Sequence, residues 1–329
     1  MVTREVSENA IVPGLVRIIL AVLLALSCAV PSFGAQKIVA AVLTADLHRY
    51  REAHRAFVRT IAQKGYDSSN IEIIVQTPNP DPISWANTIR KFEAIGADII
   101  VTYGAPVTLA AMRESRETPI VFVDVYGPVE TGISRSMTMT GKNLCGVSSK
   151  VPMVTLVKTA QELKNIRNLG VIYSSREAGS LVQLQELKRI AAQQGFAVIE
   201  ANISSTSGFD AALNSILSRV DCLYVSECAV GSRLFEKITA RANGHKVPVI
   251  SQMPEAAEKG ALVALEVSPA EQGQLAGEYA AKVLNGAKPG QMPIVTPKKI
   301  ELIINMRAAR ALDLHVPFQG LSAATKILK

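Results

Sequence analysis

Polar side chains in this sequence recur directly after short apolar segments that are rich in isoleucine and valine. Such segments are typical of buried parallel strands, and open α/β sheets bind ligands at the carboxyl ends of their strands. The residues at these ends are therefore candidate ligand contacts. They are Thr44, Asp46, Tyr103, Gly104, Ala105, Asp124, Tyr126, Tyr173, Ser174, Ser175, Glu227 and Gln252.

Some of these residues are suited to an anionic group. The turn Gly104-Ala105-Pro106 leads into a predicted helix N-terminus, where free N–H groups and the helix dipole favour an anion such as a carboxylate. Ser174 and Ser175 add hydroxyl donors from the second half of the chain. These serines are equally suited to capping a helix, and Pro106 is explained by helix geometry alone.

Other candidates are suited to a cationic or flat ligand group. Asp46, Asp124 and Glu227 can receive an ammonium, although Asp46 is equally suited to capping the helix that begins near Leu47. The tyrosines offer flat apolar surface with a polar tip, and packing within the fold is the alternative role for each. The tyrosines in question are Tyr103, Tyr126 and Tyr173.

Signals of catalysis or of a cofactor are missing from the sequence. It has no Gly-x-Gly-x-x-Gly after a strand, no Gly-x-x-x-x-Gly-Lys phosphate loop and no Gly-x-Ser-x-Gly nucleophile turn. The four histidines are scattered. We therefore expect no enzyme, no cofactor and no metal site. An exported α/β enzyme stays as an alternative if the fold brings Cys228 beside a histidine.

Apolar segments alternate with longer amphipathic stretches along the chain. The predicted strands are 38–43, 71–75, 98–102, 120–125, 169–173, 197–201, 222–225 and 247–250. The predicted helices, several of which stop at a glycine, are 48–64, 84–95, 107–115, 181–194, 209–219, 234–243 and 273–284. Strand–helix–strand units of this length need right-handed crossovers and predict parallel sheets that helices cover on both faces.

The order of these units predicts an α/β protein with two Rossmann-like lobes, each with a parallel central sheet flanked by helices. A first series of units precedes a break near 137–151, and a second series follows it. We expect three interlobe crossovers, at 138–150, 261–269 and 292–296, so that the lobes hinge as rigid bodies. The expected boundaries are 35–148 plus 267–292 for lobe 1 and 149–266 plus 293–329 for lobe 2.

The first residues predict export. Arg17 precedes an apolar run at 18–30, which is shorter than the roughly 20 residues of a membrane span, and small residues follow it. We expect 1–34 to be a signal peptide cleaved after Gly34, and the mature protein to be periplasmic or otherwise extracytoplasmic. A lipoprotein anchored through Cys28 is the alternative, because Ala25-Leu26-Ser27-Cys28 is a weak version of that processing site.

Composition argues against a nucleic-acid partner. The net charge is +7, but lysine and arginine are dispersed and only 5% of residues are aromatic, so no basic block alternates with stacking rings. Beyond the export segment the cysteines are Cys145, Cys222 and Cys228, an odd number that cannot all pair within one chain. A Cys222–Cys228 bridge is not expected, because these residues lie at opposite ends of a predicted strand.

Segments spread over 37–317 together resemble a known family. They are 96–101 (GADIIV), 118–122 (TPIVF), 141–148 (GKNLCGVS), 169–173 (LGVIY), 259–261 (KGA), 283–289 (VLNGAKP) and 304–312 (INMRAARAL). In this order and spacing they resemble the ABC-transporter substrate-binding family that includes the tryptophan/tyrosine-type binding proteins. The resemblance implies the type I periplasmic-binding fold, a monomer, a small-molecule ligand and an ABC permease in the membrane as partner.

Three turns at the strand ends depart from the pattern that the resemblance implies. The chain has Gly127-Pro128 where Asp-Pro is common, Ser174-Ser175-Arg176-Glu177 in place of an Asn-Pro-x-Glu type turn, and Glu227-Cys228 in place of Asp-Asn or Asp-Thr. The ligand expected here is therefore an amino acid or similar small zwitterion, without assignment to the aromatic amino acids.

Together these features predict an extracytoplasmic solute-binding protein of an ABC importer, which captures its ligand between the lobes by hinge closure. The alternative is that the same module presents its ligand to a sensor kinase or chemoreceptor. The sequence does not separate these two roles.

Overall fold

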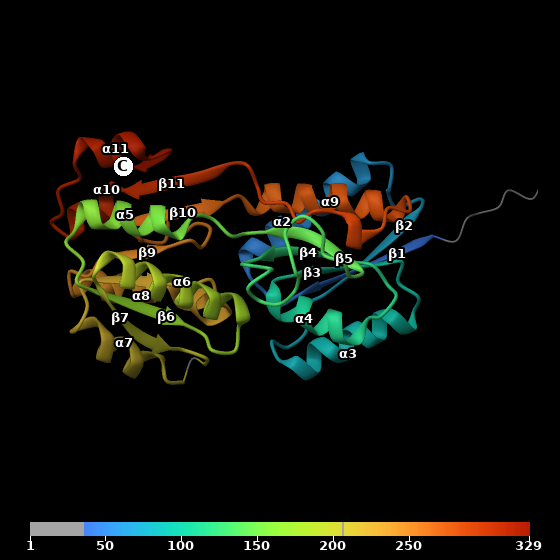
Figure 1. Cartoon of the computed structure of the whole chain (residues 1–329), viewed down its shortest axis with the longest axis horizontal. Coiled ribbons are helices and arrows are strands. Elements are labelled where there is room, and N and C mark those ends of the chain that lie inside the picture. The colour runs from blue at the N-terminus through green and yellow to red at the C-terminus, as the bar shows by residue number, and fades with distance from the viewer. Residues whose placement is uncertain (1–35, 206) are drawn as a thin grey trace, which may run out of the picture. The chain divides into compact units, whose positions relative to one another are not determined.

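The computed structural model describes residues 36–205 and 207–329, which build two β-sheets covered by helices (Figure 1). The predicted signal peptide and Cys28 lie outside the described residues. A five-stranded sheet has the order β2-β1-β3-β4-β5, and a seven-stranded sheet has the order β12-β11-β10-β9-β8-β6-β7. No helix among the described residues has the length and apolar character that a membrane span needs.

The five-stranded sheet is parallel throughout. Its strands are β1 (Lys37–Leu43), β2 (Ile71–Gln76), β3 (Ile99–Tyr103), β4 (Ile120–Val125) and β5 (Leu144–Ser148). Its helices are α2 (His48–Gln63), α3 (Pro82–Ala94), α4 (Ala105–Glu114) and α9 (Pro269–Leu284). We call this sheet and these helices the N-terminal lobe.

Successive side chains along each strand of the N-terminal lobe point to opposite faces of the sheet, and a layer of helices covers each face. Val39 on β1 packs on one face with Phe57 of α2 and Ala276 of α9. Its neighbour Ala40 packs on the other face with Phe92 of α3 and other residues of that layer. Because successive side chains point to opposite faces, an unbroken apolar strand is buried on both sides.

The seven-stranded sheet, with its helices, forms the C-terminal lobe. Its strands are β6 (Asn168–Tyr173), β7 (Ala197–Asn202), β8 (Cys222–Val225), β9 (Val249–Ser251), β10 (Val263–Val267), β11 (Ile300–Asn305) and β12 (Lys326–Leu328). Its helices are α5 (Met153–Leu163), α6 (Ala178–Gln194), α7 (Phe209–Leu217), α8 (Ala229–Gly244), α10 (Met306–Ala311) and α11 (Phe318–Ala323). A short 3₁₀ turn, η1 (Pro289–Gln291), follows α9.

The predicted α/β class with two helix-flanked sheets is confirmed, with one refinement in the C-terminal lobe. There β10 and β11 pair antiparallel, while every other pair of strands is parallel among the described residues. The sequence analysis did not predict α5, α10, α11, β11 or β12. Residues 292–296 form no strand, and Val295 makes only an isolated bridge with Val147.

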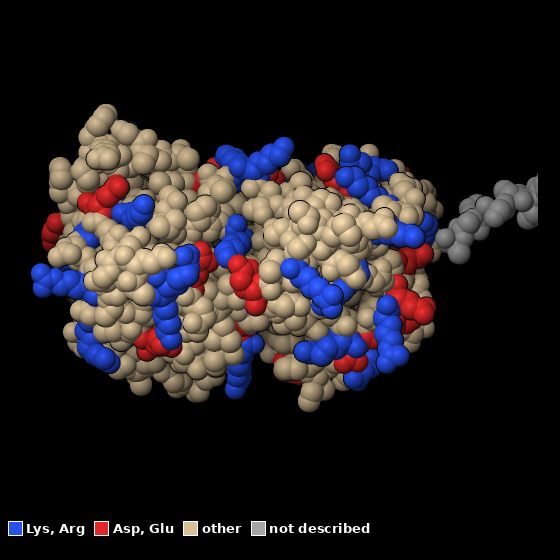
Figure 2. Space-filling model, in the orientation of Figure 1, with Lys and Arg blue, Asp and Glu red and all other residues tan. Residues whose placement is uncertain are grey.

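The chain passes between the sheets after β5, after β10 and before β11. Helix α9 therefore follows a strand of the C-terminal lobe but packs with α2 in the N-terminal lobe. Charged residues of both signs are mixed over the face of the molecule that Figure 2 shows. The exact lobe boundaries given above stay a prediction.

Two glycines allow α9 to lie against α2 at backbone distance. A Cβ atom on Gly273 would stand 1.9 Å from the carbonyl oxygen of Ala53. A Cβ atom on Gly277 would stand 2.8 Å from the Cβ of Thr60. No side chain fits at these positions unless the helices move apart.

We expect Gly273→Ala to lower the free energy of unfolding by about 1–3 kcal/mol, because the added methyl group must push α9 away from α2. Urea denaturation measures this change. Gly244→Ala is the matched control, since an exposed helical position with open space around it should gain up to about 1 kcal/mol from alanine. Equal losses in the two variants would contradict the close contact.

Candidate functional site

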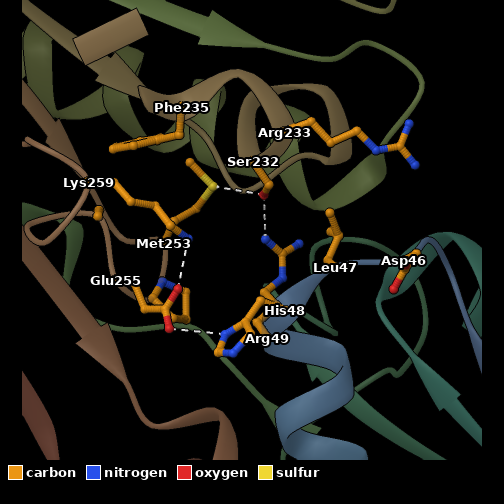
Figure 3. Close-up of a pocket in the computed structure, with 12 residues that line it drawn as sticks. Asp46, Leu47, His48, Arg49, Ser232, Arg233, Phe235, Met253, Glu255 and Lys259 are labelled. Carbon is orange, nitrogen blue, oxygen red and sulfur yellow. Dashed lines mark hydrogen bonds and ion pairs between the residues drawn. The ribbon is translucent and has the colours of Figure 1, made fainter. Parts of the chain in front are cut away.

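The carboxyl ends of the parallel strands from both lobes border a narrow cleft. A cavity of about 20 Å³, the inner cavity, is lined from the N-terminal lobe by Arg49, Tyr50, Ala105, Pro106, Asp124 and Tyr126. From the C-terminal lobe it is lined by Glu177, Gly179, Ser180 and Glu227. An outer pocket of about 200 Å³ lies beside it, and Arg49 lines both spaces (Figure 3).

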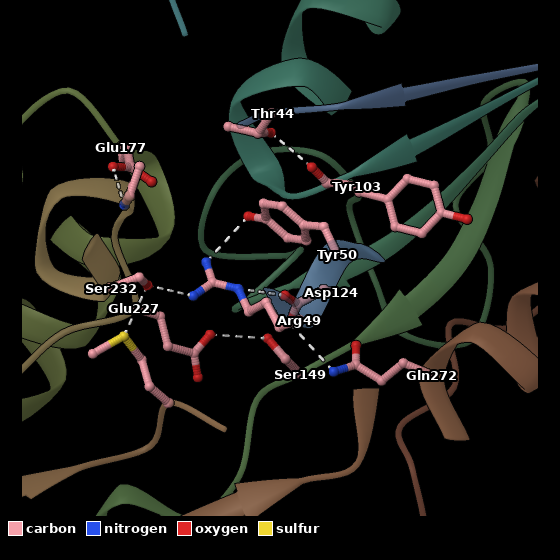
Figure 4. Close-up of polar contacts among 12 residues, drawn as sticks. Thr44, Arg49, Tyr50, Tyr103, Asp124, Ser149, Glu177, Glu227, Ser232 and Gln272 are labelled. Atoms are coloured by element: carbon pink, nitrogen blue, oxygen red, sulfur yellow. Dashed lines mark hydrogen bonds and ion pairs between the residues drawn. The ribbon is translucent and has the colours of Figure 1, made fainter. Parts of the chain in front are cut away.

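Arg49, in the first turn of α2, connects the two lobes. Its Nε lies 2.9 Å from Oδ2 of Asp124, and both side chains are less than a tenth exposed. Its Nη1 donates to Oγ of Ser232 on α8 of the C-terminal lobe at 2.9 Å. Its Nη2 donates to the hydroxyl of Tyr50 at 3.2 Å (Figure 4). A single buried guanidinium thus holds partners on both sides of the cleft.

Glu227 faces Arg49 from the C-terminal lobe, directly after β8. Its backbone N–H donates to Oε1 of Gln183 at 2.9 Å, and Ser149 donates to its carboxylate at 3.4 Å. Burial raises the pKa of Glu227 to about 8, the nearby charge of Asp124 adds to the rise, and Arg49 opposes it. Near neutral pH this carboxyl group is therefore largely protonated in this arrangement.

Glu177 is a further acidic group at the inner cavity, and it begins α6. Its Oε1 accepts a hydrogen bond of 2.8 Å from the backbone N–H of Ala229, at the start of α8. Burial raises its pKa as well, although this hydrogen bond and Arg49 oppose the shift. Carboxyl groups thus outnumber the guanidinium around the inner cavity, and a cation that enters would lower the pKa of Glu227 and stabilise its ionised form.

Asp124 adopts a backbone conformation that few residues other than glycine adopt. Its φ is +56°, and the β4–β5 register shifts between Phe122 and Val125. Gln272 of α9 donates to its Oδ1 at 3.3 Å, and Arg49 approaches its Oδ2. Aspartate is one of the residues that tolerate this left-handed region, and such exceptions cluster at functional sites. The conformation turns the Asp124 carboxylate toward Arg49.

Helix N-termini also point into the cleft. Helices α2, α4 and α6 all begin at residues that line the inner cavity or its edge, and none has a side-chain cap. The cap of α4 is Gly104, with φ +95°, where a Cβ atom would lie 2.4 Å from the hydroxyl oxygen of Tyr50. Only glycine fits there. Uncapped helix starts supply the positive potential that a ligand carboxylate needs.

Residues 41–328 match the family model for ABC transporter substrate binding proteins. The chain belongs to this ABC transporter substrate-binding protein family. The resemblance stated from the sequence is therefore confirmed. A curated relative, the tyrosine-binding protein of Clostridioides difficile (strain R20291), is 30% identical over 269 residues, which are 80% of this chain and 77% of that protein.

Solved structures agree with the fold of this substrate-binding protein. An ABC domain in complex with L-Trp from Streptococcus pneumoniae has a TM-score of 0.84 at 21% identity, over 89% of this chain and 100% of that one. A conserved domain protein from Vibrio cholerae has a TM-score of 0.84 at 26% identity, over 89% and 99%. The ligand-free, open structure of a substrate binding protein with adhesive properties from Clostridium difficile has a TM-score of 0.68 at 25% identity, over 89% and 99%.

Several residues that the sequence predicted for the site of this substrate-binding protein do meet at the cleft. Ala105, Asp124, Tyr126 and Glu227 line the inner cavity, and Gly104 caps the helix that begins there. Asp46 lines only the outer pocket, where it pairs with Arg51 on the surface. Their role as ligand contacts stays a prediction.

Other predicted residues lie away from the two spaces, elsewhere in the N-terminal lobe. Tyr103 is fully buried in the lobe core, where its hydroxyl meets Nδ1 of His54 at 3.0 Å. Thr44 is buried and donates to the carbonyl oxygen of Tyr103 at 2.7 Å. Neither lines the inner cavity or the outer pocket, because their side chains are used to pack and to join β1 with β3.

Three predicted residues of the C-terminal lobe also lie away from the two spaces. Tyr173 packs against the hydrophobic core of its lobe, and Ser175 pairs with Asn202 and Ser204 in an exposed turn. The backbone N–H of Ser174 donates to Oγ of Ser180 at 2.9 Å. None of these predicted residues lines either cavity.

Gln252, also predicted, is buried and donates to the carbonyl oxygen of Val151 at 3.2 Å, beside a segment where the chain passes between lobes. The sequence analysis missed Arg49, Tyr50, Glu177 and Ser180, which line the inner cavity. Their only local signal is a position in the first turn of a helix that follows a strand end.

The three cysteines among the described residues form no bridge. Cys145, Cys222 and Cys228 are free and buried, and burial raises the pKa of each thiol to about 12. Cys228 caps α8, since its sulfur accepts from the N–H of Gly231 at 3.3 Å. A thiol with so high a pKa is not an activated nucleophile.

One group among the described residues has the donor types of a metal site: His48, Glu52 and Glu255. His48 Nδ1 lies 3.0 Å from Oε1 of Glu255 across the outer pocket (Figure 3). Lys259 already pairs with the other oxygen of Glu255 at 2.8 Å. An ion here would therefore compete with that ammonium, and we assign no metal to this group.

The raised pKa of Glu227 makes stability depend on pH. Between its ordinary pKa of 4.5 and about 8, the folded protein retains a proton that the unfolded chain releases, so stability falls as pH rises through this window. Glu227→Gln keeps the shape of the protonated carboxyl but cannot titrate.

We therefore expect the unfolding free energy of the native protein, minus that of Glu227→Gln, to fall from about pH 5 to about pH 8, by at most about 1.4 kcal/mol per pH unit. Urea denaturation over this range measures the difference. The pKa of Glu266 is also raised to about 8, but Glu266 is present in both proteins and cancels. A difference that does not change with pH would contradict the protonated state of Glu227.

Proposed function

We propose that this chain is an extracytoplasmic solute-binding protein of an ABC importer, which binds a small molecule in the interlobe cleft by hinge closure and is not an enzyme. An amino acid or similar small zwitterion is the proposed ligand. One observation carries the proposal: buried charged residues from both lobes surround a cavity between them. An ABC permease in the membrane is the proposed partner.

The charge pattern of the cleft fits a zwitterion. An ammonium group fits among the carboxyl groups of Asp124, Glu177 and Glu227, which exceed the single guanidinium in number. A carboxylate fits at the uncapped start of α4, beside Ala105. Burial strengthens such polar contacts and penalises a ligand whose groups stay unpaired, which gives the site its selectivity.

Separate hydrophobic cores support hinge closure. Nearly all buried apolar residues of each lobe pack only within that lobe. Among the described residues, Tyr126 and Ala229 join the core of the other lobe, and Ile294, in the connection before β11, packs with the N-terminal core. The contacts across the cleft are chiefly polar, such as those of Arg49 with Ser232 and of Ser149 with Glu227. Polar contacts of this kind exchange with water when the lobes part, so opening exposes little apolar surface.

The relatives add support for a closed and an open arrangement. The chain matches the L-Trp complex with a higher TM-score than the ligand-free, open structure, 0.84 against 0.68, although its identity to the latter is higher. A closed arrangement of the lobes in this chain accounts for the higher TM-score with the L-Trp complex. An inner cavity of about 20 Å³ has room for about one water-sized group, so an amino acid requires the cleft to open first.

Export is part of the proposal. We expect the mature chain to begin at Ala35, after cleavage behind Gly34. Mass spectrometry of the protein recovered from its native compartment measures the N-terminus directly. A diacylated N-terminal Cys28 would replace this prediction with a lipid-anchored form, and an intact Met1 would contradict export.

The ligand prediction is tested by isothermal titration with the amino acids, guided by a thermal-shift screen. We expect at least one amino acid or related zwitterion to bind the wild-type protein. Asp124→Asn should weaken that binding by about 10- to 100-fold, because it removes the charge from a buried partner of the ligand ammonium. Asparagine tolerates the left-handed backbone at this position, so the fold should be kept.

Asp313→Asn is the matched control, since Asp313 also has a positive φ, of +58°. Asp313 is exposed, pairs with Lys246 and lines neither cavity. This variant should bind with unchanged affinity. If no amino acid, peptide, purine or organic acid stabilises the wild-type protein, the proposed function is contradicted. Loss of ligand uptake by cells that lack the chain separates import from signalling.

A further inference from the structure

Arg49 makes the contacts that a bound ligand is expected to make. Its guanidinium touches Asp124 and Tyr50 in the N-terminal lobe and Ser232 in the C-terminal lobe (Figure 4). It lies within the electrostatic reach of Glu227 and is less than a tenth exposed. Only a group that contacts both lobes favours the closed arrangement, and here a side chain of the protein is such a group.

We propose that the Arg49 guanidinium is a tethered occupant of the cation subsite of the cleft, and that the ligand is a small primary amine whose ammonium displaces it from Asp124. This inference rests on the proposed function for its ligand but not for its central test. Arg49 is then a residue that determines specificity. The ligand class follows from the group that must compete with a guanidinium.

The balance of charge supports a cation subsite. Asp124, Glu177 and Glu227 line the inner cavity together with one arginine, and their carboxyl groups come from both lobes. Removing the guanidinium without replacement would leave Asp124 buried and unpaired, which typically costs several kcal/mol. A ligand that displaces Arg49 must therefore bring its own positive charge to this position.

The alternative role for Arg49 is to receive the carboxylate of the ligand. Its Nη1 and Nη2 already donate to Ser232 and Tyr50, and its Nε forms an ion pair with Asp124 without a hydrogen bond. The inner cavity of about 20 Å³ is too small for either end of a ligand until the guanidinium moves. The outer pocket of about 200 Å³, which Arg49 also lines, offers space for the guanidinium after it leaves.

A chemical rescue experiment tests the subsite without knowledge of the ligand. Arg49→Ala keeps the Cβ atom, and ethylguanidinium replaces the lost methylenes and guanidinium. We expect ethylguanidinium at about ten times its Kd to raise the Tm of Arg49→Ala by about 3 °C over an equal concentration of sodium chloride. The wild-type protein should show no such gain, because its own side chain fills the subsite.

Two further variants make the rescue specific. Arg90→Ala removes an arginine whose ion pair with Glu114 is exposed, so it should behave like the wild-type protein. Adding Asp124→Asn to Arg49→Ala should abolish the gain, because the guanidinium then lacks its charged partner. Equal gains in Arg49→Ala and Arg90→Ala, or a gain that survives Asp124→Asn, would overturn the inference.

The two roles of Arg49 predict opposite effects of Arg49→Ala on the affinity for a ligand found in the screen of the wild-type protein. On our proposal it competes with ethylguanidinium in Arg49→Ala and binds that variant about tenfold more tightly, because the tethered rival is gone. Weaker binding would show that Arg49 receives the ligand carboxylate, and simultaneous binding with ethylguanidinium would place the ligand elsewhere. Both outcomes would overturn the proposal.

The design separates this inference from the proposed function. If no ligand binds the wild-type protein but ethylguanidinium rescues Arg49→Ala, the proposed function fails and the tethered cation stands. If Arg49→Ala does not fold, Arg49→Lys replaces it, since an ammonium retains the charge but cannot reach all three partners at once. Tighter ligand binding by Arg49→Lys supports displacement, and weaker binding contradicts it.

Discussion

The arrangement of this protein depends on one buried ion pair, between Arg49 and Asp124 at the centre of the cleft. Taking both charges out of water costs several kcal/mol for each, and their attraction offsets this cost only while hydrogen bonds satisfy the remaining polar atoms. Ser232 supplies one of those bonds from the opposite lobe. On the hinge closure that we propose, parting the lobes would hydrate this pair and break its contact with Ser232.

The location of these charges follows from sheet topology. In the N-terminal lobe the order β2-β1-β3-β4-β5 reverses direction between β1 and β3, and in the C-terminal lobe the parallel strands β7-β6-β8-β9-β10 repeat that order. Strand ends and helix starts gather at such a reversal, so polar groups lie there at little cost to the core. The left-handed Asp124 and the capping glycine Gly104 are local departures that this crowded edge requires.

Local pattern predicted the elements more completely than the site. Runs of isoleucine and valine identified the central parallel strands, because a strand buried on both faces needs apolar side chains at nearly every position. The strand-end rule named Asp124 and Glu227, which lie within two residues of a strand's last residue and line the inner cavity. It also named Tyr103, whose side chain lies in the lobe core, because the rule does not state to which face of the sheet the last side chain points. Arg49 and Glu177 were not predicted from the sequence. Their approach to the inner cavity depends on how the two lobes dock, which no local spacing encodes.

A tethered cation has a consequence for selectivity. A side chain held beside its partners acts at an effective concentration that free solutes seldom reach, so simple cations of the medium compete poorly for the carboxyl groups of the cleft. A larger amine gains further contacts, such as a carboxylate at the uncapped start of α4, and only such differential contacts shift the balance. On our proposal, the same guanidinium raises the threshold for every ligand that offers charge alone. Selectivity then arises from what the ligand carries beyond its ammonium group.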